Sequence, residues 1–248
     1  MIAFAAIAPH GDVDETAELR DAMAELRGRF AAADPEAAVV VTPHNVHVEG
    51  HFAVVTAGRV GEIETDRELA AAILAGLRAE GLPAVGVSYG GNDPAEAQMP
   101  LDWGTEIPLA WMRVRRVVVV SPARDRPLAE HVRAGIAIAR ASEPSDNVLQ
   151  GRRVALVASA DHGHAHDPAG PYGFDPAAAA YDTRVQEIIR SGRLDFAPLA
   201  ELVEAAKADS LWQLLVLQGA VGETAHADLL AYAAPTYYGM LCAEVSPA

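Results

Sequence analysis

Short apolar segments alternate with longer amphipathic ones along this chain, and this alternation constrains the fold more than any other feature of the sequence. Residues 2–8 (IAFAAIA), 38–42 and 152–160 are almost wholly apolar, as in strands buried on both faces. Residues 15–33 and 66–81 have apolar side chains at helical spacing. Further strands are expected at 52–58, 83–88, 115–123 and 235–245, and further helices near 107–113 and at 127–141, 176–192, 198–207 and 209–220. The pattern predicts an α/β fold with a mixed, largely parallel β-sheet flanked by helices on both faces.

The chain is expected to form a single domain over residues 1–248, since no internal repeat, low-complexity tract or linker interrupts it. Apolar residues make up 51% of the sequence, which is too many for a disordered chain. The formal charge of −15 argues against partners with an anionic surface, so neither nucleic acid nor a charged membrane is expected as a partner.

Cysteine usage and the apolar runs indicate the compartment. A lone Cys242 excludes an internal disulfide framework and a cysteine-rich zinc site, and it fits a reducing cytoplasm. The apolar N-terminus is short and lacks a basic segment, so it is expected to be a first buried strand rather than a signal peptide. No apolar run approaches the roughly 18 residues needed to cross a bilayer. A cytoplasmic location is therefore expected.

Histidines follow three of the predicted strands. His10 lies in the segment IAPHG, His44 lies in VVTPHN, and His162 and His164 lie in VASADHGH. Ligands of open α/β sheets bind beyond the carboxyl ends of the strands. The topology therefore allows these histidines to converge in one crevice.

Two histidines and one carboxylate with open positions form the ligand set of non-haem Fe(II) oxygenases. Three histidines and a water would instead indicate zinc-dependent hydrolysis, here with His10, His44 and His164. Glu244 is an unusual acid because it ends the apolar segment YYGMLCAE. The candidate carboxylates are Asp12, Glu49, Asp161, Asp167 and Glu244.

The segment 159–167, SADHGHAHD, has three histidines at alternating positions. They would share one face only if the preceding strand continued through them. Gly163 and the following Asp-Pro-Ala-Gly indicate that it does not, so the segment is not expected to be a metal cluster in itself. The HNVHVEGH stretch at 44–51 has the order H-x-E-x-H at a strand end, which differs from the helical H-E-x-x-H of zinc proteases.

Taken together, these segments resemble the class III extradiol ring-cleavage dioxygenases, the family of the catalytic β-subunit of protocatechuate 4,5-dioxygenase, whose fold Memo-like proteins share. The similarity extends over nearly the whole chain. It rests on the order of APHG, PHN, LDWGTEIPL (101–109), SADHGH, FDPAAAAYDTRV and the C-terminal AE.

The resemblance implies a role for particular residues. His10, His44 and Glu244 would be the ligands of Fe(II), with Mn(II) or Zn(II) as alternative metals. Alignment of the family's S-x-D-x-x-H pattern with residues 159–164 implies His164 as the catalytic acid/base, with His162 as the fallback.

Trp103 marks a departure from the family pattern. Many members have a histidine at this position, within L-D-H-G, and the change puts the usual catechol substrates in doubt. Trp103 and Tyr172 are candidate substrate-binding aromatics.

The implied reaction is the cleavage of a small catechol-type or 2-aminophenol-type aromatic with O2. The family also commonly forms homo-oligomers or binds a small helical partner subunit. One alternative is a Memo-like metal-binding or redox protein without ring cleavage, in which Cys242, two residues before Glu244, could take the place of the carboxylate. A zinc-dependent hydrolase is the other alternative.

Overall fold

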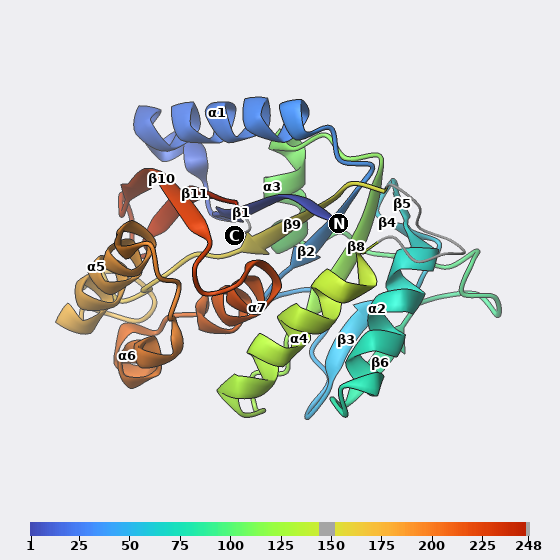
Figure 1. Ribbon diagram of the computed structural model, residues 1–248. Helices are drawn as coiled ribbons and strands as arrows, with labels where there is room; N and C mark the ends of the chain where they lie inside the picture. Colours follow the sequence, from blue (N-terminus) through green and yellow to red (C-terminus); the bar gives the residue numbers. More distant parts are fainter. Residues whose placement is uncertain (144–151, 247–248) are drawn as a thin grey trace.

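Four parallel strands form the centre of the protein. The computed structural model describes residues 1–143 and 152–246. The strands β1 (Ile2–Ala8), β9 (Val154–Ser159), β2 (Ala37–Val41) and β8 (Arg116–Ser121) lie side by side in that order (Figure 1). Because they are parallel, their carboxyl ends meet at one edge of the sheet.

Shorter and antiparallel strands extend the sheet on both sides. On one side, β11 pairs antiparallel with β1, and β10 pairs with β11. On the other side, β8 pairs with β5 and with β3, and the remaining short strands follow. Their bounds are β3 Phe52–Val55, β4 Arg59–Val60, β5 Ile63–Thr65, β6 Ala84–Val87, β7 Gln98–Met99, β10 His226–Ala233 and β11 Met240–Ser246.

Helices cover both faces of the sheet (Figure 1). Apolar side chains of α1 and α3 pack on one face, and those of α2, α4, α5, α6 and α7 pack on the other. The helices are α1 Ala17–Ala33, α2 Arg67–Ala79, α3 Trp103–Trp111, α4 Leu128–Ala141, α5 Pro176–Ser191, α6 Ala200–Ala206 and α7 Leu211–Val221, with short 3-10 turns at Val13–Glu15 and Ala197–Leu199. The predicted fold class, a single α/β domain with a mixed, largely parallel sheet, is confirmed.

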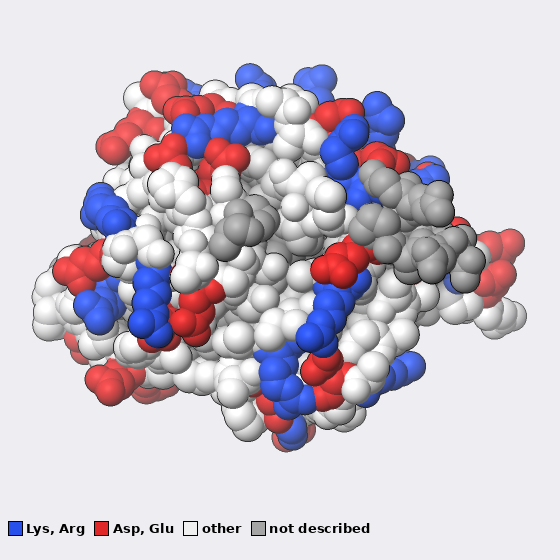
Figure 2. Space-filling view, viewed as in Figure 1, with Lys and Arg blue, Asp and Glu red and all other residues white. Residues whose placement is uncertain are grey.

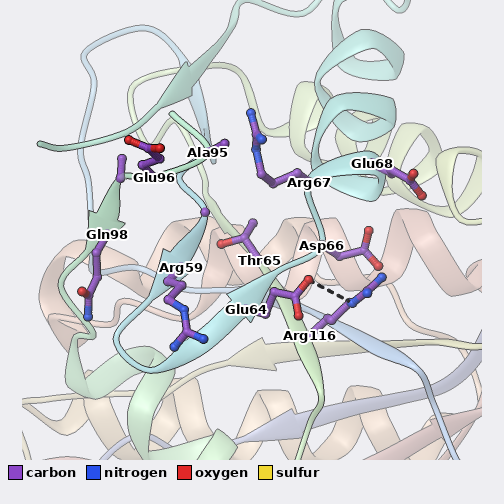
Figure 3. Close-up of a pocket in the computed structure, with 12 residues that line it drawn as sticks. Arg59, Glu64, Thr65, Asp66, Arg67, Glu68, Ala95, Glu96, Gln98 and Arg116 are labelled. Atoms are coloured by element: carbon purple, nitrogen blue, oxygen red, sulfur yellow. Dashed lines mark ion pairs between the residues drawn. The ribbon is translucent and has the colours of Figure 1, made fainter. Parts of the chain in front are cut away.

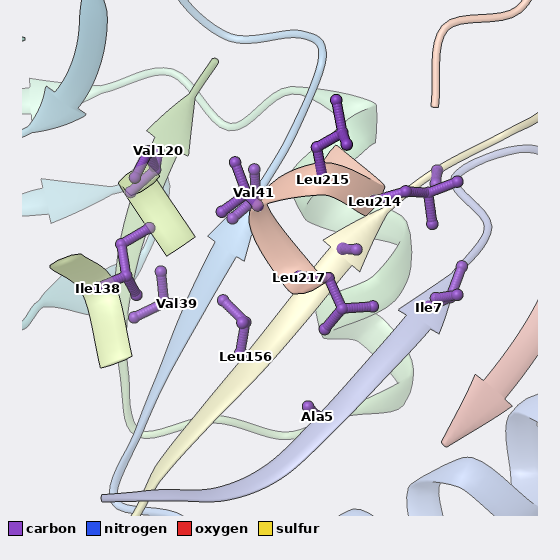
Figure 4. Close-up of a cluster of buried hydrophobic side chains, with 14 of the residues drawn as sticks. Ala5, Ile7, Val39, Val41, Val120, Ile138, Leu156, Leu214, Leu215 and Leu217 are labelled. Carbon is purple, nitrogen blue, oxygen red and sulfur yellow. The ribbon is translucent and has the colours of Figure 1, made fainter. Parts of the chain in front are cut away.

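The side-chain alternation of the strands divides the core into two clusters. Val39 and Val41 of β2 pack under α4 and α7, whereas Ala38 and Val40 point to the face covered by α1. Figure 4 shows the first cluster, where Leu214 and Leu217 of α7 and Ile138 of α4 lie over the central strands. Every residue of β2 is therefore buried, which explains why the segment is apolar throughout.

The packing of α4 against α7 depends on two glycines. A Cβ atom on Gly219 of α7 would lie 1.9 Å from the carbonyl oxygen of Val132, and one on Gly135 of α4 would lie 2.0 Å from that of Val216. The two backbones therefore approach too closely for any side chain at these positions.

The substitution Gly219→Ala should consequently destabilise the protein by about 2–3 kcal/mol, the usual cost of overpacking a tight core. The matched control is Gly28→Ala within α1, where a Cβ meets nothing within 4 Å. That control should raise stability by about 0.5–1 kcal/mol, because alanine favours a helix. Thermal unfolding of both variants would check this, and equal melting temperatures would contradict it.

Several element boundaries differ from those expected. The helix expected near 107–113 begins earlier, at Trp103, and the edge strand β10 was not anticipated. The segment expected as a strand at 235–245 starts with a turn, and only Met240–Ser246 forms β11.

Charged side chains of opposite sign lie close together on the face shown in Figure 2. The arginines on this face therefore form no continuous basic surface. Within residues 1–143 and 152–246, none of the helices combines the length and apolar content that a membrane crossing requires.

Candidate metal centre and active site

Residues that follow three central strands come together at the carboxyl edge of the sheet. His10 follows β1, His44 follows β2, and the segment Asp161–His164 follows β9. A fourth segment, the loop between α6 and α7, brings Asp209 to the same place. The convergence of His10 and His44 expected from the topology is therefore what the structure shows.

His10, His44 and Asp209 form a group with the spacing of metal ligands. The two histidine Nε2 atoms are 3.2 Å apart, and Asp209 Oδ2 is 3.8 Å from the first and 3.9 Å from the second. Ligand atoms about 2.1 Å from one ion are roughly 3–3.5 Å apart, so small side-chain adjustments would complete such a site. The other oxygen, Asp209 Oδ1, is buried and has no hydrogen-bond partner among the described residues.

Local hydrogen bonds orient the two histidines. His10 Nδ1 lies 3.1 Å from Ser159 Oγ, which leaves Nε2 to face the centre. Asn45 follows His44 with a φ of 73°, a left-handed conformation that asparagine tolerates, and its amide donates to Asp102. The chain can therefore turn sharply after β2 and hold His44 at the sheet edge.

The glycine of APHG has a steric function. A Cβ on Gly11 would lie 2.2 Å from the ring of Tyr238, so only glycine allows that ring to lie against the backbone after His10.

The electrostatics of the centre also fit a cation. Burial raises the pKa of Asp209 to about 7, against the opposing charge of Arg124. Burial and the Asp209 charge raise the pKa of Asp161 well above its usual value. Burial lowers the pKa of His10, so its imidazole is neutral and can ligate. Two buried acids beside neutral histidines would be stabilised in their charged form by a divalent ion.

Glu244 is a correction to the predicted ligand set. It pairs with Ala6 in the middle of β1, and its carboxylate lies 2.7 Å from Arg29 of α1. Because β11 is antiparallel to β1, it starts at the edge that holds His10 and runs away from it. Glu244 is four residues along this strand from Met240, or roughly 13 Å, and is not placed with His10 and His44.

Cys242, the alternative to that carboxylate, is fully buried in the apolar cluster on the α1 face. Burial raises the pKa of its thiol to about 12, so it is protonated at neutral pH and is a poor ligand. In the described chain it does not belong to the group of converging ligand atoms.

The three histidines of SADHGHAHD have three different environments, and β9 ends before them, as expected. His164 lines a cavity beside His10 and His44, and its Nδ1 lies 2.8 Å from the carbonyl oxygen of His162. His162 is fully buried, bound to Ser210, and does not line the cavity. His166 lies 2.8 Å from Asp182. The geometry therefore favours His164 over the fallback His162 for contact with a ligand.

The cavity beside His164 has a volume of about 370 Å³, which fits one small aromatic molecule. Trp103 and Tyr172 both line it and are more than half exposed, so both candidate substrate-binding aromatics lie at its walls. The Trp103 ring is 4.5 Å from that of His44. Two further aromatics not anticipated from sequence, Tyr237 and Tyr238, form the wall beside His164.

A second cavity, of about 570 Å³, lies at the opposite edge of the sheet near the amino end of β8 (Figure 3). Two of its acids are in ion pairs: Glu64 lies 3.5 Å from Arg116 of the same lining, and Asp66 lies 2.7 Å from Arg152, which is outside the lining. Among the described residues that line it there is no histidine or cysteine, and it is therefore not a candidate for the metal centre.

Asp182 of α5 holds the segment that carries His164. Its buried carboxylate accepts a hydrogen bond from the Gly163 amide at 2.7 Å, one from the Tyr232 hydroxyl at 2.7 Å, and contacts His166 Nε2 at 2.8 Å. These contacts fix the residues on both sides of His164.

Asp182→Ala should therefore destabilise the fold by about 3 kcal/mol or more, since it leaves a buried amide and a hydroxyl without acceptors. Asp182→Asn, which retains one acceptor oxygen, should cost less. Urea unfolding would measure both, and a loss below about 0.5 kcal/mol in the alanine variant would show that the network is dispensable.

Comparisons with known proteins identify the family of the chain. A family model described as the catalytic LigB subunit of aromatic ring-opening dioxygenase matches residues 5–240. The chain belongs to the LigB family. The matched range includes His10, His44, His164 and Asp209. Membership of this family supports a metal-dependent function of the aromatic ring-opening dioxygenase kind.

Among solved structures, this member of the LigB family is similar to an uncharacterized protein, JW3007, from Escherichia coli K12. The TM-score is 0.65 and the identity 17%, over 98% of this chain and 99% of that one. At this identity the likeness concerns the fold alone. No curated protein sequence matches the chain.

Proposed function

We propose that this protein is a non-haem Fe(II)-dependent extradiol dioxygenase that cleaves the ring of a catechol-type or 2-aminophenol-type aromatic with O2. The observation that carries the proposal is the convergence of His10, His44 and Asp209 beside a cavity walled by aromatics and His164. Two histidines and a carboxylate with open positions form the ligand set of oxygen-activating ferrous enzymes. The same group also provides two histidines rather than the three expected for the zinc hydrolase alternative.

Each residue has a defined part in this proposal. His10, His44 and Asp209 would hold Fe(II), which when bound supplies sites for the two ring oxygens and for O2. The aromatic walls, including Trp103, would orient the ring and exclude water from it.

His164 would move the proton. Its Nδ1 hydrogen is held by the His162 carbonyl oxygen, so the lone pair of Nε2 is free to accept a hydroxyl proton in the cavity. Burial lowers the pKa of His164, which keeps the ring neutral and ready to act as a base near pH 7. Once the ring has opened, the same nitrogen could return that proton to an oxygen atom of the product.

Oxygen consumption by anaerobically reconstituted protein tests the proposal. Protein loaded with Fe(II) is mixed with catechol, 4-methylcatechol or 2-aminophenol, and O2 uptake is followed together with the absorbance of the ring-opened product. One O2 consumed per ring opened is the expected result. Metal retained without uptake on any substrate would instead favour the Memo-like metal-binding alternative.

Loading with Mn(II) and Zn(II) in parallel identifies the working metal. Ring cleavage with O2 is expected only with a redox-active ion, Fe(II) or Mn(II). Hydrolysis of ester or amide substrates by the Zn(II)-loaded protein would instead favour the hydrolase alternative. A homo-oligomer, a small helical partner subunit and a cytoplasmic location stay predictions from the sequence.

A further inference from the structure

The residues that line the cavity beside His164 include the three acids Asp12, Asp161 and Asp209. In the described part of the chain, the lining includes neither lysine nor arginine. Asp161 Oδ2 and Asp209 Oδ2 lie 3.5 and 3.8 Å from His10 Nε2, on the inner side of the cavity. Asp12 is exposed, and we call its side of the cavity the mouth. A substituent on the far side of a bound ring would therefore meet a negative charge.

Arg124 is a cation whose charge reaches the centre, but its side chain does not line the cavity. Its guanidinium stacks over Trp212 at 4.7 Å from the ring centroid, and it is not among the residues that line the cavity. Its charge acts on the candidate ligands Asp209, His10 and His44. The guanidinium therefore lies behind the metal ligands and against Trp212, and it is not part of the cavity wall.

Tyrosine rings surround the mouth. Tyr237 and Tyr238 have ring centroids 4.8 Å apart, and Tyr172 lies 6.2 Å from Tyr237. The hydroxyl of Tyr238 accepts a hydrogen bond from the Asp12 amide at 3.2 Å, which joins the tyrosine wall to the acid. Aromatic faces beside a carboxylate favour an organic cation, because each face attracts positive charge. The overall charge of −15 also favours cationic over anionic ligands.

We infer that the ring-cleavage substrate bears an ammonium group on a short side chain, which binds between the tyrosine wall and Asp12, and that carboxylate-bearing catechols are disfavoured. This inference rests on the proposed function for the reaction, but the preference of the cavity for a positively charged ligand can be measured without turnover.

Three catechols of similar size test the inference: dopamine, neutral 4-ethylcatechol and anionic 3,4-dihydroxyphenylacetate. With the Fe(II)-loaded protein, kcat/KM for dopamine should be about tenfold above that for 4-ethylcatechol, the sum of one cation–π and one exposed charge contact. The value for 3,4-dihydroxyphenylacetate should be lower than that for the neutral compound. An anionic substrate equal to or better than dopamine would overturn the inference.

The substitution Asp12→Asn tests the negative charge of Asp12 separately from the hydrogen bond of its side chain. The asparagine oxygen can still accept the hydrogen bond that Asp12 Oδ1 receives from the Asp14 amide, so the turn is retained. The ratio of kcat/KM for dopamine to that for 4-ethylcatechol should fall about threefold. The matched control is Asp14→Asn, which makes the same charge change two residues away, outside the cavity, and should leave the ratio unchanged. Equal ratios in both variants would contradict a role for Asp12.

A binding measurement separates this inference from the proposed reaction. Ligand-observed NMR with the metal-free protein and the single phenols tyramine, 4-ethylphenol and 4-hydroxyphenylacetate needs neither iron nor turnover. Tightest binding of tyramine supports the inference even if no catechol is cleaved, in which case the proposed function alone fails. Tightest binding of 4-hydroxyphenylacetate would overturn the inference even if rings are opened.

Discussion

Asp209→Asn is expected to weaken metal binding by at least about 100-fold and to abolish ring cleavage. Asp209 supplies the single carboxylate of the converging group, and its amide counterpart lacks the negative charge that compensates a divalent ion. Removal of residues that merely support a metal ligand already costs about 10–100-fold in affinity. Metal analysis after dialysis against a competing chelator would measure the loss.

The metal-free variant should nevertheless be folded. Asp209 has a pKa of about 7 in the folded protein, above its ordinary value of 3.8, so the folded state binds more protons than the unfolded state between these values. Wild-type stability therefore falls as pH rises from about 4 to 7, and the asparagine variant lacks this dependence. At pH 8 metal-free Asp209→Asn should be at least as stable as the wild type. Unfolding curves at pH 5 and pH 8 would show this.

Glu244→Gln is the matched control for the carboxylate. The Glu244 side chain contacts Arg29, which also pairs with Glu25 and Asp228, so its neutralisation should cost less than about 1 kcal/mol. Metal content should remain that of the wild type. Loss of metal from Glu244→Gln together with retention by Asp209→Asn would reverse the assignment drawn from the structure.

The sequence identified two of the three converging residues because parallel strands impose a simple rule. His10 and His44 each follow a buried apolar strand, and the carboxyl ends of such strands meet at one edge. Glu244 was implied as a ligand by the family resemblance, and the rule could not have supported it, since the rule does not hold for an antiparallel strand. The direction of β11 depends on the preceding strand β10, whose half-exposed side chains lack a buried strand's apolar pattern.

Asp209 had no comparable signal in the sequence. It lies in Ala-Asp-Ser between two helices, where an acid before a helix is ordinarily read as a capping residue. Its approach to His10 results from the packing of α7 under β1 and β9, a contact between segments about 200 residues apart. The pattern likewise predicts Tyr237 and Tyr238 within a strand, although they lie in the turn that precedes it.

The second large effect is expected at His164. His164→Gln should reduce kcat by about 10²–10⁴-fold, the usual contribution of a positioned acid/base, while metal content stays that of the wild type. Its side chain lines the cavity but is not one of the three converging ligands, so the two properties should separate. Single-turnover kinetics and metal analysis on one preparation would test both.

His162→Gln is the informative comparison for His164→Gln, because His162 and His164 are two residues apart in the chain but lie in different surroundings. His162 is fully buried and contacts Ser210 at 2.9 Å, and burial lowers its pKa to about 4. Its substitution should lower the melting temperature, whereas His164→Gln should leave it nearly unchanged. Because burial lowers the pKa of His164, wild-type kcat/KM should fall on the acid side only below the ordinary histidine range. That acid limb should disappear in His164→Gln and persist in His162→Gln, and the opposite pattern would transfer the acid/base role to His162.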